Sequence, residues 1–98
     1  MISATIRINR SDRRVKVFQR ARVRRSEELS RGHILNLSAA GALIHSPAVP
    51  DAAPQIDLLF AGLERPCAII WRSGEHAGVR FASRLTAAEL TLAVQHEA

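Results

Sequence analysis

Hydrophobic and polar residues alternate along the chain from residue 15, which is the pattern of a half-buried β-strand. One face of this predicted strand carries Val15, Val17, Ala21 and Val23, and the other carries Lys16, Phe18, Arg20, Arg22 and Arg24. The segment SEELSRG that follows is predicted to be a turn. Five more strand-like runs are His33–Leu37, Gly41–His45, Gln55–Phe60, Pro66–Trp71 and Ala77–Phe81. Six short strands separated by turn-forming segments predict a small antiparallel barrel or sandwich.

The hydrophobic period changes near the C-terminus. Thr86 followed by Glu89 has the spacing of a capping box, and Leu85 with Leu90 has that of a hydrophobic staple. A helix of roughly ten residues is therefore expected to pack on the strands. Its apolar face consists of Leu90, Ala93 and Val94.

The composition is that of one small domain. The chain has 98 residues, of which 47% are hydrophobic, and no apolar run is long enough to span a membrane. The N-terminal residues MISATIRINRSDRR lack the apolar centre of a signal peptide, so a cytoplasmic location is expected. One cysteine, Cys67, fits a reducing compartment and is predicted to be an inert core residue.

Charge is distributed unevenly along the chain. Residues 1–31 carry ten basic and three acidic side chains, a balance of +7, and residues 32–98 carry four basic and six acidic, a balance of −2. The two balances sum to the net charge of +5. A basic segment joined to a mildly acidic body indicates an anionic partner near the N-terminus, although a solvated basic tail would show the same balance.

Sequence signals of enzyme chemistry are missing. The four histidines are scattered, with no two at metal-ligand spacing, and neither a phosphate-binding loop nor a nucleophile elbow is present. His33 is predicted to share a face with Leu35 and Leu37 as a packed residue, and Asp57 and Glu64 to be solvated surface charges. We therefore expect neither an enzyme nor a metal site.

Nucleic-acid binding is a competing interpretation, because the many arginines before residue 26 could follow a phosphate backbone. Small barrels that bind single strands also need exposed aromatic rings on which bases stack. Phe60, Trp71 and Phe81 fall in strands predicted to be core, which leaves Phe18 among the basic residues. The shortage of exposed aromatic rings makes DNA or RNA a less favoured partner, but nucleic-acid binding stays an alternative.

Two motifs stand in a specific order. Arg10-Ser11-Asp12-Arg13-Arg14 gives RxxxR just before the first strand, and Asn36-Leu37-Ser38-Ala39-Ala40-Gly41 fits [D/N]xSxxG between two strands. With the closing segment IIWRSGEHAGVRF, the chain from Arg10 to about His96 resembles the PilZ domain family. The resemblance implies a mainly β fold, a six-stranded antiparallel barrel with a short C-terminal helix. Residues 1–14 would be a flexible basic segment and residues 15–98 the barrel with its helix.

The resemblance also implies binding of cyclic di-GMP, a bacterial second messenger, with no other cofactor. The residues that match the family's motifs are Arg10, Arg14, Asn36, Ser38 and Gly41, and further candidates are Arg13 and Asn9. An arginine fork can bind guanine O6 and N7, lie on a purine face or hold a phosphate. The Ser38 hydroxyl can donate to the ligand, and Gly41 leaves room for it, although both residues also suit a plain turn.

Position 36 is predicted to meet the N1–H and N2–H₂ groups of guanine, which are all hydrogen-bond donors. Asn36 offers one acceptor oxygen where aspartate would offer two, at a cost of about 1 kcal/mol in binding. The hypothesis is a receptor whose N-terminal arginine segment changes on binding cyclic di-GMP and contacts an unidentified downstream protein. The alternatives are a PilZ-like protein adaptor without nucleotide binding and a small nucleic-acid-binding barrel.

Overall fold

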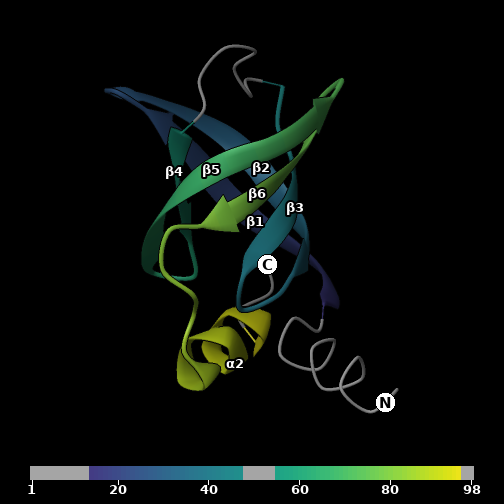
Figure 1. Cartoon of the computed structure of the whole chain (residues 1–98), viewed down its shortest axis with the longest axis vertical. Coiled ribbons are helices and arrows are strands. Elements are labelled where there is room, and N and C mark those ends of the chain that lie inside the picture. The colour runs from purple at the N-terminus through teal and green to yellow at the C-terminus, as the bar shows by residue number, and fades with distance from the viewer. Residues whose placement is uncertain (1–13, 48–54, 96–98) are drawn as a thin grey trace, which may run out of the picture.

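The computed structural model describes residues 14–47 and 55–95. Within these ranges the chain forms six strands and one helix. The strands are β1 (Val15–Arg25), β2 (Glu28–Leu37), β3 (Gly41–His45), β4 (Gln55–Phe60), β5 (Leu63–Ser73) and β6 (His76–Phe81). They close into an antiparallel barrel in the order β1-β2-β3-β6-β5-β4, and the helix α2 (Ala87–Gln95) lies at one end of it (Figure 1). The predicted mainly β barrel with a C-terminal helix is confirmed.

The barrel interior is filled by the inward-facing residues of the six strands, as expected for a small closed sheet. Ile34, Leu37, Ile44 and Leu58 are among the largest side chains with almost no exposed surface. Phe60 and Phe81 stack inside with ring centroids 6.0 Å apart. Cys67 is buried as predicted, and desolvation raises the pKa of its thiol to about 12. A thiol that stays protonated at neutral pH is a poor nucleophile, which supports a packing role.

The predicted turn over SEELSRG is wrong for most of its length. Only Ser26 and Glu27 form the turn, with Ser26 at φ 55°, and β2 already begins at Glu28, opposite Arg25. The start of β2 lies in a hairpin arm whose two faces both meet solvent, so that Glu28 and Leu29 are exposed. A strand that is exposed to solvent on both faces carries no hydrophobic alternation for sequence analysis to detect.

Three register shifts interrupt the strand pairing, and those in β2 and β5 change which side chains face inward. They lie between Lys16 and Gln19, between Ile34 and Asn36, and between Ile69 and Trp71. Such β-bulges insert an extra residue into one strand and so move the following side chains to the other face. This explains two corrections. His33 does not share a buried face with Leu37, because Ile34 faces the core instead, and Trp71 is 48% exposed rather than part of the core.

The helix is held in place from both ends. Thr86 Oγ1 accepts from the Glu89 amide at 3.0 Å, and the Glu89 carboxylate accepts from the Thr86 amide at 2.9 Å, which confirms the capping box. The helix packs Ala93 into the core. Its last turn receives a buried hydrogen bond at 3.0 Å from the Gln19 side-chain amide of β1 to the Ala93 carbonyl.

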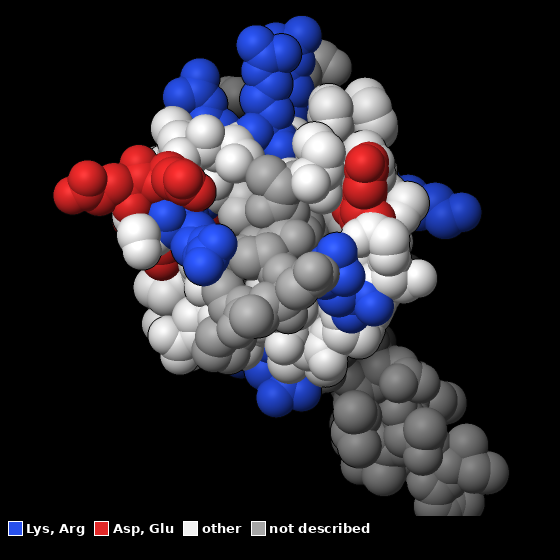
Figure 2. Space-filling model, turned by 90° about the horizontal axis from the view of Figure 1, so that it is seen from above, with Lys and Arg blue, Asp and Glu red and all other residues white. Residues whose placement is uncertain are grey.

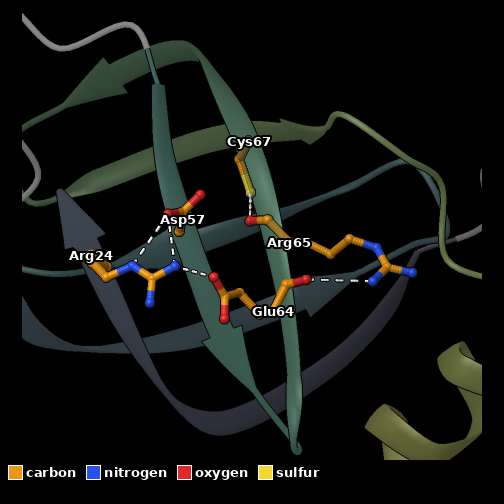
Figure 3. Close-up of polar contacts among 5 residues, drawn as sticks. All are labelled: Arg24, Asp57, Glu64, Arg65 and Cys67. Atoms are coloured by element: carbon orange, nitrogen blue, oxygen red, sulfur yellow. Dashed lines mark hydrogen bonds and ion pairs between the residues drawn. The ribbon is translucent and has the colours of Figure 1, made fainter. Parts of the chain in front are cut away.

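Two groups of ion pairs join β4 and β5 to β1 and to the helix. Arg24 of β1 donates to Asp57 of β4 at 2.9 Å and also pairs with Glu64 of β5, and these hydrogen bonds raise the pKa of Arg24 (Figure 3). Arg65, next to Glu64, pairs with Glu89 of the helix. Asp57 and Glu64, predicted to be solvated surface charges, are partly exposed and are both partners of one arginine.

Candidate functional site

The turn between β2 and β3 is built around Ser38. Its hydroxyl oxygen accepts from the backbone amides of Ala40 at 3.3 Å and Gly41 at 3.2 Å, and its hydroxyl donates to the Gly41 carbonyl at 3.3 Å. The Ser38 amide donates to the same carbonyl at 2.9 Å. With the side chain buried, this is a serine closing its own turn, as short hydroxyl side chains commonly do. The contacts shown for Ser38 are therefore structural ones.

Gly41 has a structural reason for lacking a side chain. A Cβ at this position would overlap the backbone carbonyl of Val79 in β6. Gly41 pairs with Arg80 in the β3–β6 register, so the two strands approach closely where the turn ends. Sequence analysis assigned this glycine to leaving room for the ligand or to a plain turn, whereas the structure shows close approach of a neighbouring strand.

The same turn is joined to both β6 and the start of the helix. The Phe81 amide donates to the Ala40 carbonyl and the Leu85 amide to the Ala39 carbonyl, each at 2.8 Å. Leu85 is buried and precedes the helix cap. A movement of the turn would therefore displace the residues at the start of the C-terminal helix, to which it is hydrogen-bonded.

Asn36, two residues before Ser38, is placed differently. Its side chain is half-buried, and its Oδ1 atom is buried with no hydrogen-bond partner among residues 14–47 and 55–95. A buried acceptor that is left unpaired costs about 1–3 kcal/mol. Asn36 is thus a polar group that the described fold does not satisfy.

Pairing across the barrel places Asn36 in a row of outward-facing residues. Lys16 of β1, Leu43 of β3, Gly78 of β6 and Trp71 of β5 follow one another in register with it. The Trp71 indole lies over Gly78, where a Cβ would overlap the ring. An aromatic surface therefore lies on the same side of the barrel as the unpaired Asn36 oxygen.

Trp71 is the site residue that sequence reasoning missed. It was predicted to be core because strand alternation through CAIIW places it inward. The bulge between Ile69 and Trp71 breaks that alternation. A glycine at position 78 in the closing strand is the one sequence signal that could have indicated a large ring above it.

The structure brings Arg14 to this end of the barrel. It directly precedes β1, whose first residue Val15 pairs with Leu37, so Arg14 comes next to the Ser38 turn. Its side chain is exposed. Arg80, exposed and opposite Gly41, adds a second cation beside the turn. Neither arginine has an ion-pair partner within the described ranges.

The remaining predicted site residues Asn9, Arg10 and Arg13 lie outside the described residues. The structure therefore gathers Arg14, Asn36, Ser38 and Gly41 at one end of the barrel.

In the part of the chain that the structure describes, no group of three or more His, Cys, Asp or Glu side chains could hold a metal ion. Three histidines that sequence analysis described as scattered do lie in register across β2, β3 and β6. They are His33, His45 and His76. Among the described helical residues, none forms a helix long and apolar enough to cross a membrane.

Comparison with known proteins identifies a family. A family model described as "PilZ domain" matches residues 8–96, nearly the whole chain. No curated protein matches the chain.

Proposed function

The chain belongs to the PilZ domain family, and on that premise we propose that it is a receptor for cyclic di-GMP, bound on the outer surface of the barrel beside the Ser38 turn. Domains of this family bind ligands or partner proteins rather than catalyse reactions. The site combines Arg14, Asn36 and Trp71 with the turn of residues 38–41.

The observation that carries this proposal is the unpaired Oδ1 atom of Asn36. The Watson–Crick edge of guanine presents the N1–H and N2–H₂ donors, which require acceptors. A buried acceptor without a partner is already desolvated, so a guanine donor gains a hydrogen bond there without a further desolvation cost at Asn36. Trp71, 48% exposed in the same row, offers a ring on which a purine can stack.

Arginine supplies the interactions with phosphate and with the other guanine edge. Arg14 lies where it can reach a ligand at the turn, and a guanidinium can grip a phosphate or guanine O6 and N7 bidentately. The family resemblance adds Arg10, with Arg13 and Asn9 as further contacts. Ser38 and Gly41 shape the turn that the ligand meets.

We further propose that the ligand changes the N-terminal arginine segment and thereby the surface offered to a downstream protein. A second route for the signal is the turn itself, because Ala39 is bonded to Leu85 at the helix start. Hydrogen exchange of residues 5–15 and of the helix, with and without cyclic di-GMP, measures both. Unchanged exchange in both segments at saturation would contradict this mechanism.

Isothermal titration of the protein with cyclic di-GMP tests the binding itself. The expected result is saturable binding that is lost in Arg10→Ala/Arg14→Ala and absent with GTP. Arg25→Ala is the matched control, because Arg25 is an exposed arginine at the far end of β1. Binding that survives the double substitution, or that falls equally in the control, would overturn the assignment of the arginines. If cyclic di-GMP produced neither heat of binding nor a shift in melting temperature, the protein would instead be interpreted as a PilZ-like adaptor without nucleotide binding.

A further inference from the structure

A second group of arginines lies on the outer face of the barrel, away from the Ser38 turn. Arg20 and Arg22 of β1 and Arg31 of β2 point outward, and we refer to these three residues as the arginine patch. Arg20 and Arg22 are about 7 Å apart along the strand. Arg22 and Arg31 are direct cross-strand neighbours, with Cβ atoms about 5 Å apart.

The arginine patch is not neutralised by the rest of the described structure. None of its three members has an ion-pair partner among residues 14–47 and 55–95, whereas Arg24, two residues beyond Arg22, has two carboxylates. Like charges directly opposite one another in a sheet repel. The fold therefore leaves the repulsion between Arg22 and Arg31 uncompensated, although the charge of nearby Arg24 is neutralised by two carboxylates. An anionic group bound between Arg22 and Arg31 would relieve this repulsion.

The patch borders a groove that is hollow enough for a ligand. The groove has a volume of about 880 Å³ and runs between the arginine patch and the β4–β5 turn. Its apolar side includes Leu59 and Leu63, and His33 lines it next to Arg20. The exposed Phe18, 62% accessible, stacks on His33 with ring centroids 4.5 Å apart. Figure 2, looking down on the barrel, shows basic side chains standing together at one edge of the molecule.

We propose that this groove is a docking site for an acidic peptide segment of a partner protein. Arginines and exposed aromatic rings around an apolar surface are the composition of protein-binding hot spots. The positive track is short and ends at carboxylates, because the next outward-facing arginine of β1, Arg24, is paired with Asp57 and Glu64, and Glu64 also lines the groove. A nucleic-acid strand would continue past the three arginines onto those carboxylates. A short segment with a few acidic residues and an apolar side chain matches both the arginines and Leu59.

Fluorescence anisotropy with a labelled synthetic peptide of glutamates and interspersed leucines tests the proposal. The control probes are the same peptide with glutamine replacing glutamate and a labelled oligothymidylate. We expect the acidic peptide to bind wild-type protein and Arg22→Gln/Arg31→Gln to weaken it by about tenfold or more, since two charged contacts are lost. The charge-matched control Arg25→Gln/Arg72→Gln changes exposed arginines outside the groove and should weaken it by less than about threefold.

The result is decisive in each direction. Failure of the acidic peptide to bind, or equal loss in both double variants, would overturn the proposal. Tighter binding of oligothymidylate than of the acidic peptide would replace it with nucleic-acid binding. Arg22→Gln/Arg31→Gln is expected to melt no lower than wild type, because a repulsive pair is removed. It should also bind cyclic di-GMP as wild type does, so that failure here is distinguishable from failure of the nucleotide site.

Discussion

Ser38 and Asn36 belong to one short motif, yet the fold treats them in opposite ways. Ser38 is buried with its hydroxyl engaged by the backbone of its own turn. Asn36 has a buried oxygen for which the described chain supplies no partner. Gly41, at the far end of the motif, has a structural role like that of Ser38, because the β6 backbone occupies the space that a side chain would need.

The difference separates residues that shape a site from residues that are free to bind in it. A residue whose polar atoms are already paired stabilises the unliganded protein, and its replacement lowers stability first. A residue with an unpaired buried atom gains no hydrogen bond on folding, so its replacement removes none and affects binding first. The substitutions below use this contrast between Asn36 and its two neighbours in the motif.

Gly41→Ala should have the largest effect on stability. The added methyl group overlaps the Val79 carbonyl, and separating β3 from β6 to relieve the overlap is expected to cost about 3 kcal/mol. Urea unfolding measures this free energy. Gly62→Ala is the control, because Gly62 has φ 77° with open space around it, so the substitution carries backbone strain of about 1 kcal/mol without a clash. Equal destabilisation by both substitutions would contradict close strand approach at Gly41.

Ser38→Ala should be the next largest. It removes the acceptor for the Ala40 and Gly41 amides and is expected to lower the free energy of unfolding by about 1–2 kcal/mol. Ser73→Ala, at an exposed position near the end of β5, is the matched control with an expected change close to zero. If Ser38→Ala were as stable as wild type but failed to bind cyclic di-GMP, the hydroxyl would belong to the ligand rather than to the turn.

Asn36→Ala should lower the free energy of unfolding least among the three motif positions, by no more than about 1 kcal/mol, because no hydrogen bond within the described structure is lost and the unpaired buried acceptor is removed. Its expected effect is on calorimetric binding of cyclic di-GMP, which should weaken by about tenfold. Asn36→Asp supplies a second acceptor for the guanine edge and should tighten binding by about fivefold, equivalent to about 1 kcal/mol. A marked loss of stability in Asn36→Ala would break the contrast with Ser38.

The smallest effect is expected at the helix that the turn contacts. The hydrogen bond from the Thr86 amide and the hydrogen bond from Arg65 lower the pKa of Glu89, so the stabilising contribution of its carboxylate is present above the unfolded pKa. That contribution is lost as the pH falls through the lower folded pKa. Melting temperatures of wild type and Glu89→Gln should therefore differ at pH 6 and converge in strong acid. A difference that does not depend on pH would exclude the carboxylate charge as its cause.

Sequence patterns predicted much of the barrel. The bounds of β3 and β4 agree with the predicted strands Gly41–His45 and Gln55–Phe60, and the helix begins at the predicted capping box. These elements have one buried face or a local side-chain signal. The early part of β2 was missed because it is exposed on both faces, and Trp71 was misplaced because a bulge changes strand phase without a distinctive residue type.

The candidate site was only partly predictable. The motif placed Asn36, Ser38 and Gly41 together, but local spacing could not show that Gly41 faces the Val79 carbonyl or that the Ser38 hydroxyl is engaged in the turn. The row that joins Asn36 to Trp71 depends on registers between four strands. Such registers include two bulges and connect residues far apart in the sequence, so they could be recognised only in the folded barrel.

The most direct test of the account is an NMR titration that follows the side-chain amide of Asn36 and the indole N–H of Trp71 as cyclic di-GMP is added. Both signals are expected to shift together and to saturate at the stoichiometry found by calorimetry, while the Arg25 backbone amide at the far hairpin stays unchanged. Saturable binding that moves neither side-chain signal would contradict the assignment of Asn36 and Trp71 to the nucleotide site.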